Sequence, residues 1–513
     1  MSLQLDVNPL REGLARERVA DPCVFVIFGG TGDLAYRKLL PALYHLHLAD
    51  LLPRGFAIVA YASTQLTDDQ YRESVRQAIS KASPYLTTEG PVWDSFASST
   101  FFVCRCAGGL DSLRTLRDRL GEVNTLTGAE GNYLFYLAIP PGAFTETTEG
   151  LAEVGLAHDE NGHGWRRLVV EKPFGTDLAS ARELNLVLRK CFAEDQIYRI
   201  DHYLGKETVQ NIMVFRFANE FVEPLLNSKY VDSVQITVAE GIGIESRGAF
   251  YDRTGALRDI VQNHTLQILS LVCMEPPVSL DADAVRDEKS KVFASIRRIA
   301  PSDVDELTVR GQYGDGVLLG EHVAAYREES DIAPDSTTET FVAAKFLVDN
   351  WRWAGVPFYV RTGKRLAKRV TEISIHLKAI PRVLFGEEHR DEIAPNVIAM
   401  NIQPGEGISM IFEAKVPGLG YRIQPVKMDF RYEAAFGASA PDAYERLLLD
   451  AMLGDPSLFS RADSLEATWE IVQPILDGWR SRRSPAYPYL PGSWGPRESA
   501  EFIERDGRRW RRL

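Results

Sequence analysis

The chain has 513 residues, more than one hydrophobic core normally organises, so two or three domains are expected. Hydrophobic residues make up 45% and charged residues 25%, as in ordinary globular proteins, and no stretch reaches the ~20 apolar residues that span a bilayer. The net charge of −13 disfavours general binding to nucleic acid or to an anionic membrane. The first twenty residues lack a continuous apolar core, so we expect no signal peptide.

The five cysteines are few, odd in number and scattered, which argues against a disulfide framework. Cys104 and Cys106 stand two apart, and we expect them to be two packed thiols. No other Cys or His pair has zinc-ligand spacing, so no metal site is expected. A reducing compartment, most simply the cytoplasm, follows from this cysteine usage.

After a tail at 1–20, residues 21–200 alternate between strand-like and helical patterns. Continuous apolar runs suit strands that are covered on both faces. They lie at 23–28, 55–62, 132–140 and 166–175. This alternation predicts a Rossmann-type α/β domain with a parallel, doubly wound sheet.

From about Tyr230 the pattern changes, and residues 201–513 are predicted to form an α+β domain on a large, mainly antiparallel sheet. Strand-like runs lie at 232–240, 339–349, 357–363, 372–380, 396–403 and 407–415, and helical patterns at 256–273, 441–453 and 465–479. The basic end, GRRWRRL at 507–513, is expected to be a solvated tail.

A glycine turn, GGTGDLA at 29–35, joins the first strand to the first helix. Gly29 permits a tight exit from the strand, and Gly32 lets the backbone approach a pyrophosphate at the helix N-terminus. Gly29, Gly32 and Ala35 give a variant of the usual dinucleotide fingerprint. The alternative is a purely structural strand-to-helix turn.

The adenosine end of this predicted site is less defined. An acid after the second strand favours NAD, and an Arg favours the 2′-phosphate of NADP. Residues 61–65 are YASTQ, which contain neither. The choice of cofactor therefore stays open at this point.

A second motif, RIDHYLGKE at 199–207, gathers ionisable groups. His202 and Lys206 are four apart and share a face if the segment is helical. A cation, an imidazole and a phenol hydroxyl together can grip a phosphate. The alternative is the charged start of a surface helix.

These motifs together resemble the glucose-6-phosphate dehydrogenase family. Besides GGTGDL and RIDHYLGKE, the matching segments are EKPFG at 171–175, GALRDIVQNHTLQ at 255–267 and RTGKRLAKR at 361–369. The resemblance implies oxidation of glucose 6-phosphate at C1 to 6-phosphoglucono-δ-lactone, the first step of the oxidative pentose phosphate pathway, with NADP or NAD. It also implies a homodimer or homotetramer associating through the large sheet.

The resemblance also implies roles for matching positions. It makes Asp201 and His264 a catalytic dyad. It places the sugar phosphate against His202, Tyr203, Lys206 and Arg369, and the glucose ring against Lys172, Glu240, Asp259 and Lys364. It assigns the cofactor to Gly29, Gly30, Thr31, Gly32, Asp33, Leu34, Lys38, Ser63, Lys172 and Pro173, with a cis peptide before Pro173.

The chemistry suits these residues, because oxidation at C1 releases a hydroxyl proton that the protein must accept. Imidazole has an ordinary pKa of about 6.5, close to operating pH, and a carboxylate can orient it. From the pattern alone, His264 sits on an apolar helical stripe and could be a core residue. An ideal helix also puts Asp259 about 140° around the axis from His264. Either the helix is irregular there, or Asp259 reaches the sugar from its first turn.

One position departs from the family. Many members carry an Arg where this chain has Ser63, whereas Thr31 and Lys38 retain two other contacts to the 2′-phosphate. We therefore expect activity with both cofactors and a weakened NADP preference. If the protein instead depends strictly on NADP and Ser63→Arg does not change this, Arg37 is the first candidate for holding the phosphate. Two alternatives stay open: a non-catalytic nucleotide-binding regulator, and a dehydrogenase of another hexose phosphate. Two further cations of the 361–369 run, Arg365 and Lys368, are interpreted as parts of a solvated loop.

Overall fold

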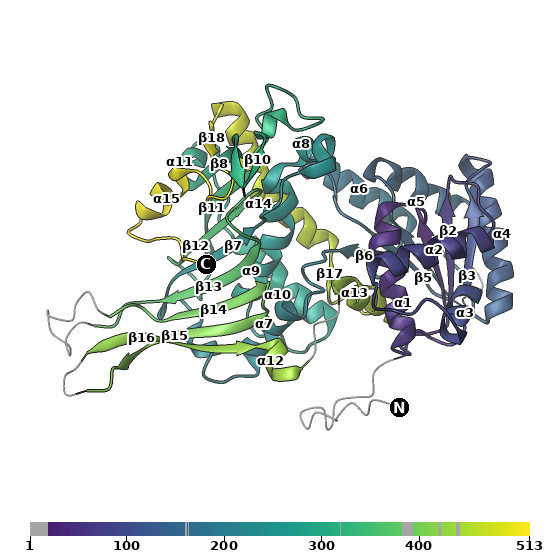
Figure 1. The fold of residues 1–513 in the computed structure, drawn as a ribbon, viewed down its shortest axis with the longest axis horizontal. Coiled ribbons are helices and arrows are strands. Elements are labelled where there is room, and N and C mark those ends of the chain that lie inside the picture. Colours follow the sequence, from purple (N-terminus) through teal and green to yellow (C-terminus); the bar gives the residue numbers. More distant parts are fainter. Residues whose placement is uncertain are drawn as a thin grey trace. The chain divides into compact units, whose positions relative to one another are not determined.

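A computed structural model describes residues 19–159, 162, 164–318, 320–381, 393–418, 422–437 and 442–513. The predicted tail at 1–20 thus lies outside the described residues except for its last two. The chain divides into two compact units (Figure 1). The first unit comprises Met1–Val170, Leu188–Tyr198 and Tyr444–Pro456, and the second comprises Glu171–Val187, Arg199–Ala443 and Ser457–Leu513.

The first unit contains five parallel strands of a seven-stranded sheet, and β1 (Val24–Phe28) is the middle one of these five. On one side β1 pairs with β2 (Ala57–Ala62), and β2 with β3 (Thr100–Cys104). On the other side it pairs with β4 (Tyr133–Leu137), and β4 with β5 (Arg166–Val170). The strands are buried almost throughout, as expected when helices cover both faces. The predicted doubly wound sheet is confirmed, although β3 was not predicted.

The helices of this unit follow the strands in turn. Helix α2 begins with a capping box in which the Thr67 hydroxyl accepts from the N–H of Gln70 and the Gln70 side chain accepts from the N–H of Thr67. Its buried residues Tyr71, Val75 and Ile79 are spaced by four. The helices are a π-helix (Ala35–Leu39), α1 (Leu40–Leu48), α2 (Asp68–Ala82), α3 (Pro91–Ser98), α4 (Gly109–Thr127), α5 (Phe144–Glu153) and α13 (Ala443–Leu453). β6 (Ile197–Ile200) lies beside β5 and leads into the second unit.

The second unit contains a nine-stranded sheet in the order β16-β15-β14-β13-β7-β12-β11-β8-β18. Only β7 with β12 and β8 with β18 run parallel among its neighbouring pairs. The sheet is therefore mainly antiparallel, as predicted. Its strands are β7 (Val231–Ala239), β8 (Thr308–Tyr313), β11 (Phe341–Leu347), β12 (Pro357–Gly363), β13 (Val370–Leu377), β14 (Val397–Gln403), β15 (Gly407–Lys415), β16 (Ile423–Arg431) and β18 (Ala486–Tyr489).

The helical pattern predicted at 256–273 is interrupted in the structure. α8 (Gly248–Ala256) leads into a π-helix (Leu257–Thr265), and only then does α9 (Leu266–Cys273) begin. The predicted helical stretch is therefore confirmed, and its first half is irregular, which is one of the two possibilities left open above. Other helices of this unit are α7 (Glu207–Phe217), α10 (Ala282–Ser295), α14 (Ala462–Arg482) and α15 (Arg497–Glu504), and α6 (Leu178–Cys191) crosses between the units.

The basic C-terminal segment is docked, so its prediction as a solvated tail was wrong. The indole N–H of Trp510 donates to the carbonyl of Ser499 at 2.8 Å, and the ring lies 4.5 Å from the guanidinium of Arg361. Arg511 pairs with Glu372 at 2.9 Å. Buried carboxylates and aromatic rings offer these cations better partners than water, which composition alone does not reveal.

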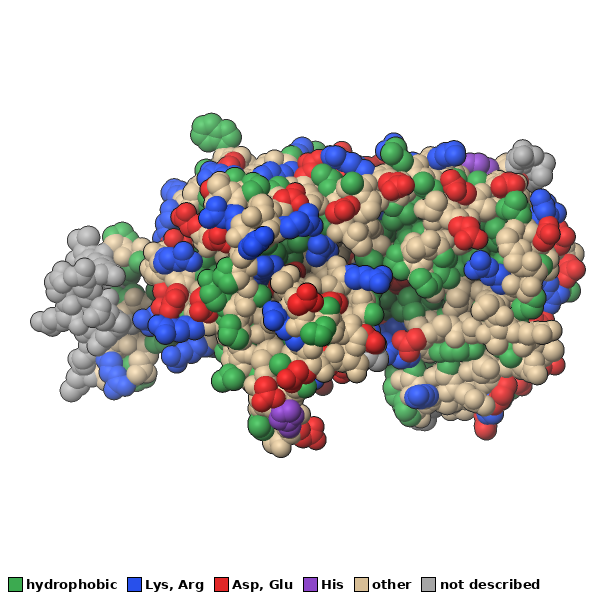
Figure 2. Space-filling view, turned by 90° about the horizontal axis from the view of Figure 1, so that it is seen from above, with side chains coloured by type: hydrophobic (Ala, Val, Ile, Leu, Met, Phe, Trp, Pro, Cys, Tyr) green, Lys and Arg blue, Asp and Glu red, His purple; other side chains and the backbone are tan. Residues whose placement is uncertain are grey.

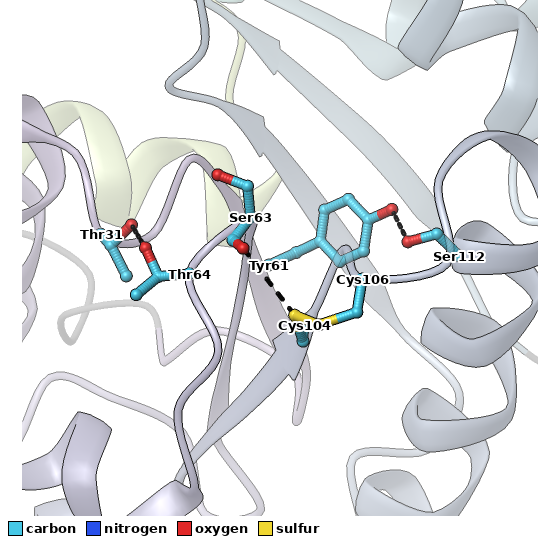
Figure 3. The surroundings of a disulfide bond; sticks show 7 residues. All are labelled: Thr31, Tyr61, Ser63, Thr64, Cys104, Cys106 and Ser112. Atoms are coloured by element: carbon cyan, nitrogen blue, oxygen red, sulfur yellow. Dashed lines mark hydrogen bonds between the residues drawn. A yellow bond between two sulfur atoms is a disulfide. The ribbon is translucent and has the colours of Figure 1, made fainter.

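The two neighbouring cysteines also differ from expectation. Cys104 and Cys106 are joined in a disulfide with their Cα atoms 5.1 Å apart, inside the usual range for such a bond (Figure 3). Side chains two residues apart along an extended chain point to the same side, and this brings the sulfurs together. The expectation of two packed thiols was therefore wrong. Cys23, Cys191 and Cys273 are buried and free.

The surface mixes charges of both signs. Figure 2 shows acidic and basic side chains intermixed over the visible face. In the part of the chain that the structure describes, no helix is long and apolar enough to cross a membrane. No group of three or more potential ligands among the same residues is placed to hold a metal ion.

Candidate active site

The glycine turn of the first unit follows β1 directly. Gly29 has φ +80°, and a Cβ there would lie 2.3 Å from the carbonyl oxygen of Ala138. A Cβ on Gly30 would lie 2.5 Å from that of Ala60. The N–H of Gly32 donates to the carbonyl of Gly29 at 2.8 Å and closes the turn. Glycine is thus required at the first two positions, and the bare main chain fits a cradle for a pyrophosphate.

Polar groups surround this turn at the carboxyl edge of the parallel sheet. The hydroxyls of Thr31 and Thr64 are 3.3 Å apart, and exposed Ser63 lies between β2 and Thr64 (Figure 3). Asp33 pairs with Arg37 at 3.1 Å on the surface. The other predicted cofactor positions of this unit, Leu34 and Lys38, lie where the first helix starts. The edge of an open parallel sheet is where such folds bind nucleotides.

The predicted dyad is a buried pair within the second unit. His264 lies on the π-helix and Asp201 directly follows β6. Nδ1 of His264 is 2.5 Å from Oδ1 of Asp201, which also accepts the N–H of Tyr203 at 2.9 Å. Burial opposes ionisation of Asp201, but the charge and hydrogen bond of His264 outweigh it and hold the carboxyl pKa below its usual range. Burial lowers the pKa of His264, against the opposing effect of Asp201.

Lys172 connects this dyad to a second carboxylate. Its Nζ lies 2.9 Å from Oδ1 of Asp259 and 3.0 Å from Nε2 of His264. The π-helix explains how both can be reached, because its i→i+5 hydrogen bonding stacks residues five apart on one face. The helix is therefore irregular here, which is the first of the two possibilities that the sequence left open for Asp259. The Lys172–Pro173 peptide is cis.

Glu240 and Lys364 form a close ion pair beside this group. Lys364 is only 2% exposed, and its charge also acts on Asp259. Burial raises the pKa of the Asp259 carboxyl, but Lys172 and Lys364 more than compensate and lower it below the usual range. Four predicted ring contacts therefore form one partly buried, charge-balanced cluster of alternating acids and bases.

The predicted phosphate contacts also gather around the dyad. The Tyr203 ring stacks on the His264 ring at 4.2 Å, and the His202 ring lies 4.4 Å from it. The ammonium of Lys206 lies 4.6 Å from the centroid of Tyr203. Lys206 and Arg369 both donate to the same oxygen of Gln403, Arg369 at 3.4 Å. Burial, then the charge of Arg369, lowers the pKa of Lys206 to about 8. Two cations converging on one oxygen suit an incoming anion.

Sequence reasoning missed two residues here. Gln403 and Thr371 face each other across β14 and β13, and the Gln403 amide donates to the Thr371 hydroxyl at 3.1 Å. Thr371 also lies 3.4 Å from the hydroxyl of Tyr203. Neither belongs to a charged motif, and only strand register brings them to the site. Of the two cations interpreted as solvated, Lys368 is exposed, whereas Arg365 reaches Glu329 at 3.4 Å and is half-buried.

The comparisons with known proteins cover nearly the whole chain. Residues 26–211 match the family model for the NAD binding domain of glucose-6-phosphate dehydrogenase, and residues 213–511 match that for its C-terminal domain. The chain belongs to the glucose-6-phosphate dehydrogenase family. The family assignment makes it an NAD(P)-dependent oxidoreductase, as the motifs predicted.

Relatives and solved structures agree with this assignment. The glucose-6-phosphate 1-dehydrogenase of Aggregatibacter actinomycetemcomitans is 46% identical over 493 residues, which cover 96% of this chain and 98% of that protein. That of Chlamydia pneumoniae is 45% identical and covers 98% of each. A glucose-6-phosphate dehydrogenase solved in complex with its substrate glucose-6-phosphate has a TM-score of 0.88 at 34% identity, over 97% of this chain and 100% of that one. The enzyme of Mycobacterium avium has a TM-score of 0.80 at 38% identity, over 96% and 99%.

Proposed function

We propose that this protein oxidises D-glucose 6-phosphate at C1 to 6-phosphoglucono-δ-lactone, with NADP or NAD as the hydride acceptor. The observation that carries the proposal is the chain of contacts from Asp201 through His264 to Lys172, together with the neighbouring ring cluster and the two cations that converge on Gln403. The nicotinamide, held through the glycine turn, supplies the acceptor for the hydride. The first-unit positions predicted to hold the cofactor, together with Lys172 and Pro173, remain part of this proposal.

His264 accepts the proton of the C1 hydroxyl. When the Nδ1–H of His264 donates to Asp201, Nε2 carries the lone pair that can act as the base. In this structure that lone pair accepts a hydrogen bond from Lys172. When the substrate binds, its C1 hydroxyl replaces Lys172 at Nε2 of His264, and Lys172 turns to an oxygen atom of the sugar ring. Asp201 fixes the tautomer and stabilises the imidazolium that forms. The lowered pKa of His264 keeps the base neutral at pH 7.

The remaining residues bind the two ends of the substrate. Lys206 and Arg369, with His202 and Tyr203, receive the phosphate. Lys172, Glu240, Asp259 and Lys364 alternate in charge, so each hydroxyl of the ring finds a donor or an acceptor. This concentration of cations inside an acidic protein offsets the overall repulsion of a phosphate.

The assay of choice follows absorbance of the reduced nicotinamide with glucose 6-phosphate, galactose 6-phosphate and free glucose, each with NADP and NAD. We expect the highest kcat/KM with glucose 6-phosphate and measurable turnover with both cofactors. Highest kcat/KM with another hexose phosphate would contradict the substrate assignment. Binding of the cofactor without turnover of any sugar phosphate would instead favour the non-catalytic regulator.

We further propose a homodimer or homotetramer that associates through the edge of the large sheet. β16 is exposed along nearly its whole length and carries Val426 and Met428, which are 43% and 61% exposed (Figure 1). A long apolar edge strand invites pairing with a second copy. Light scattering should show an oligomer that Met428→Glu dissociates, while Val278→Glu, at an even more exposed site elsewhere, has no effect. A monomeric wild-type protein would contradict this.

A further inference from the structure

The adenosine end of the glycine-turn site lacks the arginine that many relatives place at Ser63. A structural substitute must come from a neighbouring element at the same edge of the sheet. β2 and β3 run parallel in the register Ala62 with Cys104. Ser63 and Arg105 are the residues that follow these two strands, and the N–H of Arg105 donates to the carbonyl of Ala62 at 2.7 Å.

The side chain of Arg105 lies on the same face of the sheet as that of Tyr61 on β2. Tyr61, two residues before Ser63, points towards α4, where its hydroxyl lies 2.5 Å from that of Ser112 (Figure 3). Arg105 is on this face too, because its charge acts on Tyr61 and its guanidinium lies 3.6 Å from Glu146 of α5. Side chains at aligned positions of parallel strands are neighbours. Arg105 thus follows β3, the strand next to β2, after which many relatives carry their arginine.

Two features hold Arg105 ready for an anion. The disulfide joins the residues on either side of it, Cys104 and Cys106, and the Cys104 sulfur lies 3.9 Å from the carbonyl of Ser63 (Figure 3). This bond restricts the main chain of Arg105 at the rim of the site. The pair with Glu146 is long, and its side chains are 46% and 71% exposed, so it is weak and readily exchanged for a phosphate.

We propose that Arg105, supplied by β3 in place of the arginine missing at Ser63, binds the 2′-phosphate of NADP and determines how strongly this enzyme prefers NADP over NAD. The inference rests on the proposed function, since it assumes that the glycine turn holds the dinucleotide. Glu146 competes for the guanidinium when the 2′-phosphate is absent. The two residues therefore act in opposite directions on cofactor preference.

Binding of cofactor fragments tests this without turnover. Calorimetry would measure the Kd of adenosine 2′,5′-bisphosphate and of adenosine 5′-phosphate for the wild-type protein, Arg105→Gln, Glu146→Gln, Arg37→Gln and the control Arg114→Gln on α4. We expect Arg105→Gln to weaken the bisphosphate about tenfold or more and the monophosphate by less than about twofold. Glu146→Gln should tighten the bisphosphate, and Arg114→Gln should leave both unchanged.

Several outcomes would overturn the inference. These are an equal loss of both fragments in Arg105→Gln, no loss of either, or a selective loss of the bisphosphate in Arg37→Gln only. In each of these cases the wild-type protein still binds the fragments and the proposed function stands. A wild-type protein that binds neither fragment would contradict the cofactor site itself, and with it the proposed function.

Discussion

The two predicted binding regions differ in how their residues are held. In the second unit the sugar-phosphate region consists of buried and partly buried charges that satisfy one another: Asp201 with His264, Lys172 with Asp259, and Lys364 with Glu240. In the first unit the cofactor region is a turn of bare main chain edged by exposed polar side chains. A buried charge without its partner is costly, so each residue of the first kind needs its neighbour. An exposed cation that binds the cofactor needs no such partner, so a residue of a neighbouring strand can provide it.

The largest effect is expected from a substitution of the proposed base, His264. His264→Asn should lower kcat by about 10²–10⁴-fold, the usual value of a general base, with little change in the Kd of glucose 6-phosphate. Stopped-flow assays and calorimetry on the same samples would measure both. Near-normal turnover would show that His264 is a core residue packed beside Tyr203.

The phosphate end should respond next. Lys206→Ala removes one of two cations at Gln403 and should raise KM for glucose 6-phosphate about tenfold or more, with a smaller effect on free glucose as a poor substrate. Lys368→Ala, an exposed lysine nearby in sequence to Arg369, serves as the control and should change neither constant. Equal damage to both substrates would argue against a phosphate contact.

At the cofactor end, Ser63→Arg should shift kcat/KM towards NADP by about tenfold, because it adds a second guanidinium at the 2′-phosphate. The effect is expected to be smaller than at the base, since exposed contacts are more easily substituted. Steady-state assays with each cofactor give the ratio directly. Strict NADP dependence of the wild-type protein, unmoved by Ser63→Arg, would mean that another residue already saturates this phosphate.

The smallest effect concerns pH. Lys206 has its pKa lowered to about 8 by burial and by Arg369, so it is charged below that pH and loses its proton above it. KM for glucose 6-phosphate should therefore rise as pH increases past about 8, and a bound phosphate would move this rise to somewhat higher pH. In Lys206→Ala the rise should be absent. A wild-type KM that stays flat to pH 10 would contradict the assignment of Lys206.

The contrast between the two regions explains which parts of the fold and of the site could be predicted from the sequence. Both sheets were predicted from hydrophobic patterns, and every predicted residue of the charged cluster except Glu240 lies in one of the five motifs. Each motif is continuous in the sequence and could therefore be found without knowing which partner it meets. An irregular helix at 257–265 was one of two possibilities that the sequence left open, since these residues suit a regular helix equally well. Gln403, Thr371 and Arg105 were missed for a shared reason. Only the register between strands distant in sequence brings them to a site, and a single sequence does not specify that register.

The central claim is that this protein removes a hydride from C1 of glucose 6-phosphate. Glucose 6-phosphate deuterated at C1 can be incubated with the wild-type protein and each cofactor, and the nicotinamide product analysed by mass spectrometry. We predict one deuterium in the reduced cofactor, with the lactone or its hydrolysis product formed in equal amount. Reduced cofactor without deuterium, or no reduction with this sugar phosphate, would contradict the account.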